Sequence, residues 1–257
     1  MTQITLSIKK SVDQNASTYF EKAKKAKKKI EGVKEALIKL EKNLSDVSEK
    51  EIIVKSEEKL KKIKEKRKQE WYEKFHWFIS SEGFLCVGGR DATSNEIIIK
   101  KHADKEDFVF HTEAPGSPFF VIKVKDKKPT EKTFKEVAAA TAAFSKAWKL
   151  GLGTAEVYMI KPDQVKKELG LPKGSFMIHG KRKYFRPALI LSIGTTKKGM
   201  VMSGPESAVK KNCDKYVNIE QGREKTSAVA KSIHKKIGGD LDEIIRALPA
   251  GGCKIKR

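Results

Sequence analysis

The first quarter of the chain carries a repeating apolar pattern embedded in charged residues. From position 12 to position 44, small and apolar residues recur at alternating intervals of four and three, the spacing of the buried seam of a left-handed coiled coil. The residues of this seam are Val12, Ala16, Tyr19, Ala23, Ala26, Ile30, Val33, Leu37, Leu40 and Leu44. The pattern predicts a long helix that packs against a partner helix.

A second, weaker copy of the pattern follows a polar turn. Residues 43–51 read NLSDVSEKE, in which Ser48 and Glu51 have the spacing of a helix capping box. The residues that resume the seam are Ile53, Ser56, Leu60 and Ile63. A short polar turn between two periodic segments favours an antiparallel pair. We therefore predict that residues 1–70 form a long antiparallel two-helix coiled-coil hairpin, with an arm about 50 Å long.

The pattern changes at residue 71, where short strand-like runs alternate with helical segments. The strings that predict strands are WYEKFHWFISSEGFLCVGGRD (a strand–turn–strand unit), DFVFH, FFVIKV, EVYMI, PALILSI and GMVMS. FMIHGKRKYF predicts a hairpin that turns over Gly180–Lys181. The strings that predict helices are IIIKKH behind a capping box of Thr93 and Glu96, EKTFKEVAAATAAFSKAWKL behind Pro129–Thr130, SAVKKN, and KTSAVAKSIHKKIG.

This mixture of elements predicts the fold class. Several of the predicted strands are joined by tight turns, which favours a mixed α+β domain over a doubly wound parallel sheet. We expect this globular domain to cover residues 71–239. Residues 240–257 are expected to form a short helix and a frayed basic tail, LPAGGCKIKR.

The charge balance points to a polyanionic partner. The 257 residues include 55 Lys and Arg against 33 Asp and Glu, giving a net charge of +22 and a pI near 9.7. This is typical of nucleic-acid-binding proteins and also occurs in proteins of heat-loving organisms. No apolar run approaches the ~20 residues of a membrane span, and the start MTQITLSIKK lacks the apolar segment of a signal peptide. We expect a cytoplasmic protein that binds nucleic acid and not a membrane.

The sequence contains no recognised catalytic or metal-binding motif. The best candidates for a metal site are charged residues and histidines between positions 90 and 111, but their spacing matches no motif such as HExxH. These candidates are Arg90, Asp91, Glu96, His102, Asp107 and His111. The strings GGRD and APGSP match neither of the glycine-rich nucleotide-binding patterns, and the three cysteines lie too far apart for a zinc site. We expect no cofactor and no metal.

One basic and aromatic segment has the composition of an RNA-binding surface. If KRKYFR is a strand, Arg182, Tyr184 and Arg186 lie on one face. Guanidinium groups beside a ring can bind phosphates while a base stacks on the ring. Alternatively, Tyr184 or Phe185 belongs to the core and the cations are merely solvated. The sequence leaves both interpretations open.

Several longer strings carry a family resemblance. The strings are WYEKFHWFISSEGFLCVGGRDATSNEIIIKK, DFVFHTEAPGSPFFVIK, AFSKAWKLG and LPKGSFMIHGKRKYF, which occur in this order. They closely resemble the NFACT-R domain, the RNA-binding region of the NFACT family of ribosome quality-control factors. The resemblance covers roughly residues 71–237, and NASTYFEKAKKAKKKIEGVKEAL resembles the middle coiled coil of the same family.

The resemblance implies a non-enzymatic RNA-binding protein that grips rRNA or tRNA on stalled large ribosomal subunits. The coiled coil would be a bracing arm, and the α+β domain would bind phosphates. Together with the basic segment above, it gives as candidate RNA-contacting residues Arg90, Asn95, Lys100, Lys101, His111, Ser117, Lys173, Arg182, Lys183, Tyr184 and Arg186.

The sequence also departs from the family pattern. Full-length members begin with an NFACT-N domain and a helix-hairpin-helix region, which are absent here, so we expect either a C-terminal part or a split gene with a separate NFACT-N chain. Tail elongation depends in the family on an Asp-Arg pair in that region, and Arg90–Asp91 is a different, reversed pair. His76, Pro118 and His179 stand where relatives often have other residues.

Two other functions stay open at this stage. The first is an interaction scaffold in which the coiled coil recruits a protein partner and the basic charge only affects solubility. The second is a metal-dependent nucleic-acid-processing enzyme built on residues 91–111.

Overall fold

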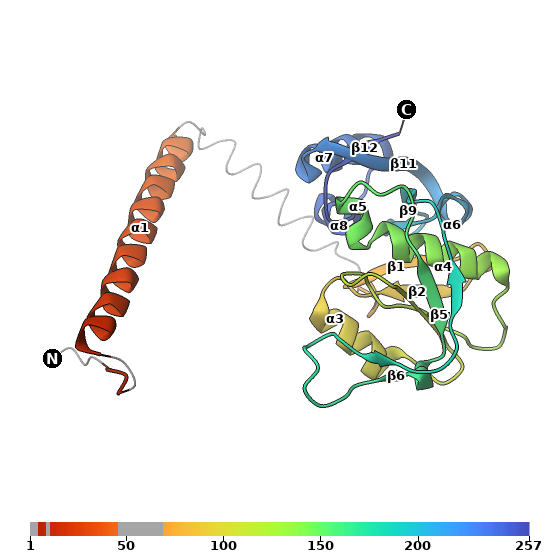
Figure 1. Ribbon diagram of the computed structural model, residues 1–257. Coiled ribbons are helices and arrows are strands. Elements are labelled where there is room, and N and C mark those ends of the chain that lie inside the picture. Colours follow the sequence, from red (N-terminus) through yellow and green to blue (C-terminus); the bar gives the residue numbers. More distant parts are fainter. Residues whose placement is uncertain (1–4, 9–10, 46–68, 257) are drawn as a thin grey trace. The chain divides into compact units, whose positions relative to one another are not determined.

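The computed structural model describes residues 5–8, 11–45 and 69–256, and the chain divides into two compact units, residues 1–68 and 69–257 (Figure 1). In the first unit, α1 (Val12–Ser45) is one continuous helix of 34 residues, which confirms the first helix predicted from the apolar seam. The predicted turn, the Ser48–Glu51 box and the second helix lie outside the described residues. The antiparallel pairing therefore stays a prediction.

Helix α1 begins at a reciprocal pair of hydrogen bonds. The main-chain N–H of Gln14 donates to Ser11 Oγ at 3.2 Å, and the N–H of Ser11 donates to Gln14 Oε1 at 3.1 Å, which satisfies two donors at the helix start. The seam side chains Ile30, Val33 and Leu37 are each more than half exposed. An exposed apolar seam is a surface that a partner helix can cover. No described helix is both long and apolar enough to span a membrane.

The second unit is built on a six-stranded antiparallel sheet. In spatial order its strands are β1 (His76–Ile79), β2 (Leu85–Gly88), β4 (Phe120–Ile122), β3 (Phe108–Thr112), β5 (Val157–Ile160) and β8 (Lys183–Phe185).

Apolar side chains project from both faces of this sheet, because successive residues of a strand point to opposite sides. Phe110 belongs to a cluster covered by α4 (Glu131–Ala143), whereas its neighbour Val109 belongs to a second cluster on the other face. That second face is covered through the π-helical turn η1 (Ile98–His102), which follows α3 (Ala92–Ile97) without a break. The sheet is therefore buried on both sides.

A second, four-stranded antiparallel sheet continues the same core. Its strands in spatial order are β10 (Val201–Gly204), β9 (Leu191–Thr196), β11 (Cys213–Glu224) and β12 (Cys253–Ile255). The helices beside it are α6 (Glu206–Asn212), α7 (Thr226–Ile237) and α8 (Leu241–Ala247). Figure 1 shows α4 crossing the unit between the two sheets, and buried residues of both sheets belong to one apolar cluster. The predicted mixed α+β class is confirmed.

The predicted hairpin over Gly180–Lys181 is wrong. The strand before it, β7 (Met177–Ile178), pairs with β6 (Val165–Lys166), whereas β8 pairs with β5 of the large sheet. Gln164 explains the difference, because its Nε2 donates to the carbonyl oxygens of residues 179 and 181 at 2.7 and 3.0 Å. The chain therefore passes over Gln164 and does not fold back on itself.

The predicted frayed tail is also wrong. Strand β12 adds to β11, and Cys253 is fully buried. Trp148 Nε1 donates to the carbonyl of Gly252 at 3.1 Å. Burial of one apolar residue and pairing with the free side of β11 hold this short segment in place.

Two helix starts differ from the prediction. The N-cap of α3 is Asp91, whose Oδ1 accepts from the N–H of Ser94 at 2.7 Å, so the capping box is formed by this pair and not by Thr93 and Glu96. The long helix predicted behind Thr130 ends at Ala143. Ser145 then caps a separate helix, α5 (Lys146–Lys149), by accepting from the N–H of Ala147 at 3.1 Å. This break decides where the lysines of α5 lie.

Candidate functional site

A cleft of about 650 Å³ opens where four segments of the second unit meet. Its main walls are residues 89–95 at the start of α3, residues 111–119 at the end of β3 and beyond, residues 144–149 around α5, and residues 173–176 before β7. The volume lies within the range of about 300–1,000 Å³ that is typical of small-ligand sites.

The loop of residues 112–119 is fixed by side chains that the sequence marked as RNA-binding candidates. Asn95 Oδ1 accepts from the N–H of Phe119 at 2.9 Å, and its Nδ2 donates to the carbonyl of Ser117 at 3.2 Å. Ser117 Oγ accepts from the N–H of Thr112 at 3.1 Å. Asn95 and Ser117 are both buried. They shape the cleft wall, because their polar atoms are already used by the loop backbone.

Two glycines allow this close arrangement. A Cβ at Gly89 would lie 1.9 Å from Asn95 Oδ1, so only glycine leaves room for the amide. Gly116 has a φ of 93°, which other residues rarely adopt, and its carbonyl accepts from the N–H of Lys146 at 2.9 Å. The loop is thereby attached to the first residue of α5.

Three exposed lysines line the cleft, and we call them the lysine rim. They are Lys146, Lys149 and Lys173. Among the described residues, no carboxylate lies within ion-pair distance of their ammonium groups. The two carboxylates of the cleft have other partners, because Asp91 caps α3 and Glu113 binds residues of β8. The charge of Lys173 nevertheless lowers the pKa of Asp91, after the hydrogen bonds of Asp91 to Ser94. With Arg90 and three lysines against Asp91 and Glu113, the lining of the cleft is net positive.

Four rings in the same cleft form an aromatic surface, and we call them the aromatic wall. They are His111, Phe119, Tyr158 and Phe176. The centroid of Phe119 lies 4.2 Å from that of His111 and 5.4 Å from that of Phe176. Phe119 and Tyr158 are buried, whereas His111 and Phe176 are partly exposed. The two partly exposed rings are the ones that a ligand can reach.

The hydrogen bonds of His111 fix its chemistry. Nδ1 lies 2.7 Å from the carbonyl oxygen of Thr112, and because a carbonyl only accepts, Nδ1 carries the proton. Burial lowers the pKa of His111 to about 4, so the ring is neutral at pH 7. Nε2 then keeps its lone pair, and the main chain of Ser117 is a second polar neighbour of the ring. His111 offers the cleft one acceptor.

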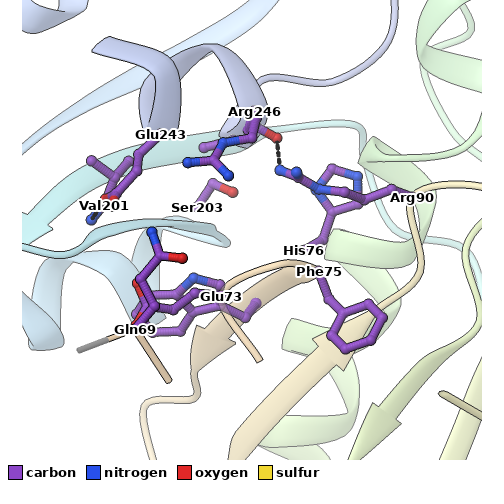
Figure 2. Close-up of a pocket in the computed structure, with 11 residues that line it drawn as sticks. Gln69, Glu73, Phe75, His76, Arg90, Val201, Ser203, Glu243 and Arg246 are labelled. Carbon is purple, nitrogen blue, oxygen red and sulfur yellow. Dashed lines mark hydrogen bonds between the residues drawn. The ribbon is translucent and has the colours of Figure 1, made fainter. Parts of the chain in front are cut away.

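Arg90 lies between this cleft and a smaller cavity of about 20 Å³ (Figure 2). Its guanidinium donates to the main-chain carbonyl of Arg246 in α8, and its Nε is buried without a hydrogen-bond partner among the residues that the structure describes. His76 lines the same small cavity, with its ring stacked 3.9 Å from that of Phe144. Burial, followed by the charge of Arg90, lowers the pKa of His76 to about 3. Arg90 thus joins the first sheet to α8.

Arg182 and Tyr184 lie on one face, as predicted, but the carboxylate of Glu113 binds both side chains. Arg182 Nη1 and Tyr184 Oη both contact Glu113 Oε1, at 2.6 and 2.8 Å. The shared contact places the two side chains on one face. Arg182 also lies over the ring of Tyr158, 4.7 Å from its centroid. Tyr184 is about half exposed and is not a core residue.

The other cations of this segment are paired in the same way. Arg186 pairs with Glu156 at 2.8 Å, and Lys183 pairs with Glu131. Phe185 packs on the apolar core. RNA contact by Arg182, Lys183, Tyr184 and Arg186 stays a prediction, and any phosphate that binds there competes with a carboxylate for each guanidinium or ammonium group.

Two further candidates lie outside the walls of the cleft. Lys100, in η1, pairs with Glu96 at 2.6 Å. Lys101 follows it and is exposed. Of the sequence candidates, the structure thus brings together Arg90, Asn95, His111, Ser117 and Lys173.

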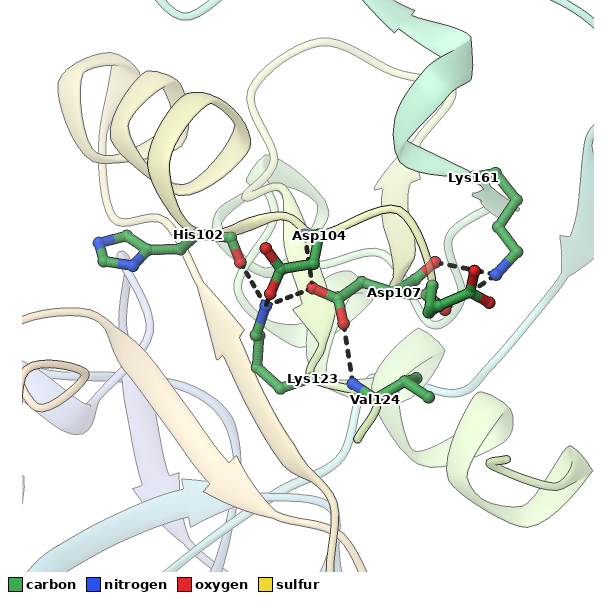
Figure 3. A network of polar contacts seen from close by, with 7 residues as sticks. His102, Asp104, Asp107, Lys123, Val124 and Lys161 are labelled. Carbon is green, nitrogen blue, oxygen red and sulfur yellow. Dashed lines mark hydrogen bonds and ion pairs between the residues drawn. The ribbon is translucent and has the colours of Figure 1, made fainter. Parts of the chain in front are cut away.

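The candidates for a metal site do not converge. Asp107 is fully buried and accepts from Lys123 Nζ at 2.5 Å and from the N–H of Val124 at 2.8 Å (Figure 3). Lys123 Nζ also contacts Asp104 at 2.6 Å, so an ammonium group already neutralises these carboxylates. His102 stacks on Trp71 with centroids 4.2 Å apart. Across the described ranges, no group of three or more His, Cys, Asp or Glu side chains is placed to hold a metal.

Two members of the lysine rim and most of the aromatic wall are not among the residues that the sequence pattern marks as RNA-binding candidates. The pattern places Lys146 and Lys149 at the end of one long helix, although residues three apart on a helix share a face. The available signal was Ser145, a residue type that favours helix N-caps, directly before KAWK. Phe176 and Tyr158 gave no signal, because apolar positions in strands are most often core.

Comparison with known proteins identifies a family match within the second unit. Residues 74–180 match the family model described as the NFACT protein RNA binding domain. This range includes the lysine rim and the aromatic wall. It ends before β8.

Similar curated proteins come from archaea and animals. The chain is 41% identical over 206 residues to the archaeal Rqc2 homolog aRqcH of Methanocaldococcus jannaschii, covering 76% of this chain and 30% of that protein. It is 33% identical over 207 residues to the ribosome quality control complex subunit NEMF homolog of Drosophila melanogaster, covering 76% and 20%. The chain thus spans less than a third of the length of these relatives. The family model and these relatives agree, and the chain belongs to the NFACT family of ribosome quality-control factors.

Proposed function

We propose that this chain is a non-enzymatic RNA-binding part of a ribosome quality-control factor, and that it holds RNA phosphates at the lysine rim. The observation that carries the proposal is the set of three exposed lysines around one cleft, none of which forms an ion pair within the part of the chain that the structure describes. A free ammonium group gains a phosphate without losing an ion pair, and each bound phosphate releases counterions. The match of residues 74–180 to an RNA binding domain supports the same site.

The RNA and the partners follow from the relatives, and they too are proposals. The printed names of the relatives describe subunits of ribosome quality control complexes. We therefore propose that the RNA is rRNA or tRNA on stalled large ribosomal subunits. Because the chain spans less than a third of these relatives, a separate NFACT-N chain is a candidate partner.

The absence of catalysis is proposed from the state of the reactive groups. Hydrolysis needs a positioned base, a nucleophile or a metal. Asp107 is bound by Lys123, Asp91 is bound by the start of α3, and the proton of His111 Nδ1 is held by a carbonyl. The two carboxylates and Nδ1 of His111 therefore have structural partners, which leaves Nε2 of His111 as the ring atom that a ligand can contact.

A salt titration tests the proposed site. A fluorescently labelled single-stranded RNA is titrated with the wild-type chain and with the double variant Lys146→Ala/Lys149→Ala at several salt concentrations. Log affinity falls linearly with log salt, by roughly 0.7 per neutralised phosphate on a single strand. We expect the double variant to bind more weakly and its slope to be shallower by about 0.7 to 1.4.

A matched variant gives the comparison. Arg182→Ala/Arg186→Ala removes two charges that are paired with Glu113 and Glu156. It removes the same net charge from the same unit, so a smaller change in slope locates the phosphates at the lysine rim. Equal affinity of wild type and the α5 variant at every salt concentration would show that the lysine rim does not bind RNA.

A further inference from the structure

The cleft combines two surfaces that a single RNA phosphate does not need. The lysine rim supplies positive charge, and the aromatic wall supplies the partly exposed rings of His111 and Phe176. A ligand that only carried charge would leave these rings in water, whereas the flat faces of nucleobases stack on aromatic rings. The arrangement fits a ligand with both a phosphate and a planar base.

The size of the cleft limits how much RNA can enter. At about 650 Å³, it is of the order of one small ligand and far too small for a base-paired helix, which is recognised from outside through its phosphates and 2′-hydroxyls. A nucleotide can enter only after it leaves its own stack. The volume therefore favours a bulged, looped or terminal nucleotide.

The polar groups inside the cleft restrict the ligand further. His111 is neutral and offers Nε2 as an acceptor, so the ligand atom beside it must be a donor. An exocyclic amino group of a base or a ribose 2′-hydroxyl meets this need. A carboxylate of an acidic peptide does not, because it only accepts.

We propose that the cleft binds one unstacked nucleotide of RNA, with its base against the aromatic wall, its phosphate at the lysine rim, and a donor group at His111 Nε2. This proposal rests on the proposed RNA-binding function and specifies its ligand. The base gives the cleft a preference for distorted RNA, while the lysines bind any phosphate.

Three RNAs test the proposal on the wild-type chain, so no variant has to fold. They are a fully paired hairpin, the same hairpin with one bulged adenosine, and the same hairpin with an abasic bulge. We expect the bulged adenosine to raise affinity about tenfold over the paired hairpin, because an unstacked base gains a ring to stack on. The abasic bulge should bind like the paired hairpin.

Variants then assign the effect to residues. Phe176→Ala should remove the preference for the bulged adenosine, so that the bulged and the paired hairpin bind with equal affinity. The control is Phe20→Ala, which removes a ring that is 81% exposed in the other unit. Melting temperature, measured beside affinity, separates loss of the ring from loss of the fold.

Two modified bulges identify the donor at His111. A bulged purine riboside lacks the exocyclic amino group, and a bulged 2′-deoxyadenosine lacks the hydroxyl. The proposal expects one of them to lose several-fold in affinity for wild type, and His111→Phe to abolish that difference. If neither modification changes wild-type affinity, the donor assignment is wrong.

The outcomes separate this inference from the proposed function. If wild type binds bulged and abasic hairpins equally, but Lys146→Ala/Lys149→Ala weakens both, RNA binding stands and the nucleotide pocket is refuted. If the lysine variant leaves every affinity unchanged, the proposed function at this site fails as well. Displacement of the bulged RNA by an acidic peptide more strongly than by adenosine monophosphate at equal charge would refute the nucleotide in favour of a protein ligand.

Discussion

The histidine of the small cavity makes the stability of the second unit depend on pH. His76 is neutral in the folded chain because burial and the charge of Arg90 lower its pKa from 6.5 to about 3. Its Nδ1 is buried, and the described ranges of the chain provide no hydrogen-bond partner for it. Protonating the folded protein places a second positive charge beside the Arg90 guanidinium. We predict that His76→Phe removes a large part of the acid sensitivity of the fold.

The magnitude follows from the two pKa values. Between pH 6.5 and pH 3 the His76 side chain is protonated in the unfolded chain and neutral in the folded chain. The contribution of His76 to the free energy of unfolding is therefore complete above pH 6.5 and is lost as the pH falls through this window. The difference of about 3.5 pKa units corresponds to about 5 kcal/mol in total, of which about 2 kcal/mol is lost between pH 7 and pH 5. His111 acts in the same direction and is retained in the variant, so it cancels.

Urea unfolding followed by tryptophan fluorescence measures this difference. All three tryptophans lie in the second unit, so the signal reports on that unit. Phe keeps a ring beside Phe144, on which His76 now stacks. We expect wild type to lose about 2 kcal/mol more than His76→Phe between pH 7 and pH 5.

The control is His234→Phe, which changes an exposed position of α7 and should leave the pH dependence as it is in wild type. An equal loss of unfolding free energy in wild type and His76→Phe would refute the reasoning, because it would mean that His76 accepts a proton as readily in the folded chain as in the unfolded one.

Two further predictions concern the supports of the fold and the cleft. Asp107→Asn leaves Lys123 Nζ with the carbonyl of His102 and with Asp104, whose side chain is 79% exposed, and should lower the free energy of unfolding by about 3 kcal/mol. Asp104→Asn, its control, should cost less than about 1 kcal/mol, and equal losses in urea unfolding would contradict the assigned role of Asp107. Gly89→Ala places a Cβ 1.9 Å from Asn95 Oδ1 and should cost about 2 kcal/mol by breaking two buried hydrogen bonds. The rate of amide hydrogen exchange in residues 112–119 should rise in this variant and not in Gly153→Ala, where a Cβ meets nothing within 4 Å. Unchanged exchange in both variants would show that the hydrogen bonds of Asn95 do not hold the loop in place.

Features that depend on neighbouring residues could be read from the sequence. The four–three spacing predicted α1, and the cap at Thr130 predicted the start of α4, because helix period and capping involve residues within one or two turns. The α+β class followed from the same local signals. The capping box predicted at Thr93 and Glu96 was wrong. Asp and Thr can both cap a helix, and the structure forms the cap at Asp91.

Pairing between distant segments could not be read in this way. β11 was not predicted, because CDKYVNIEQGRE alternates weakly and becomes a strand only between β9 and β12. The tail residues of β12 carry no strand signal strong enough to stand alone. Their strand conformation depends on a partner that ends some thirty residues earlier in the chain.

The sequence by itself determined that the chain is strongly basic, that it begins with a long amphipathic helix, and that strings across residues 71–237 resemble an RNA-binding family. It could not determine which lysines and arginines lack an ion-pair partner, because the sequence does not show which carboxylates lie beside a given cation in space. Only the tertiary structure places Glu113, Glu131 and Glu156 beside β8, from 69, 52 and 30 residues away, and leaves the lysine rim without an ion pair among the described residues. Ion pairing acts over a few ångströms of space and is indifferent to sequence distance, and for that reason the fold decides which positive charges remain for RNA.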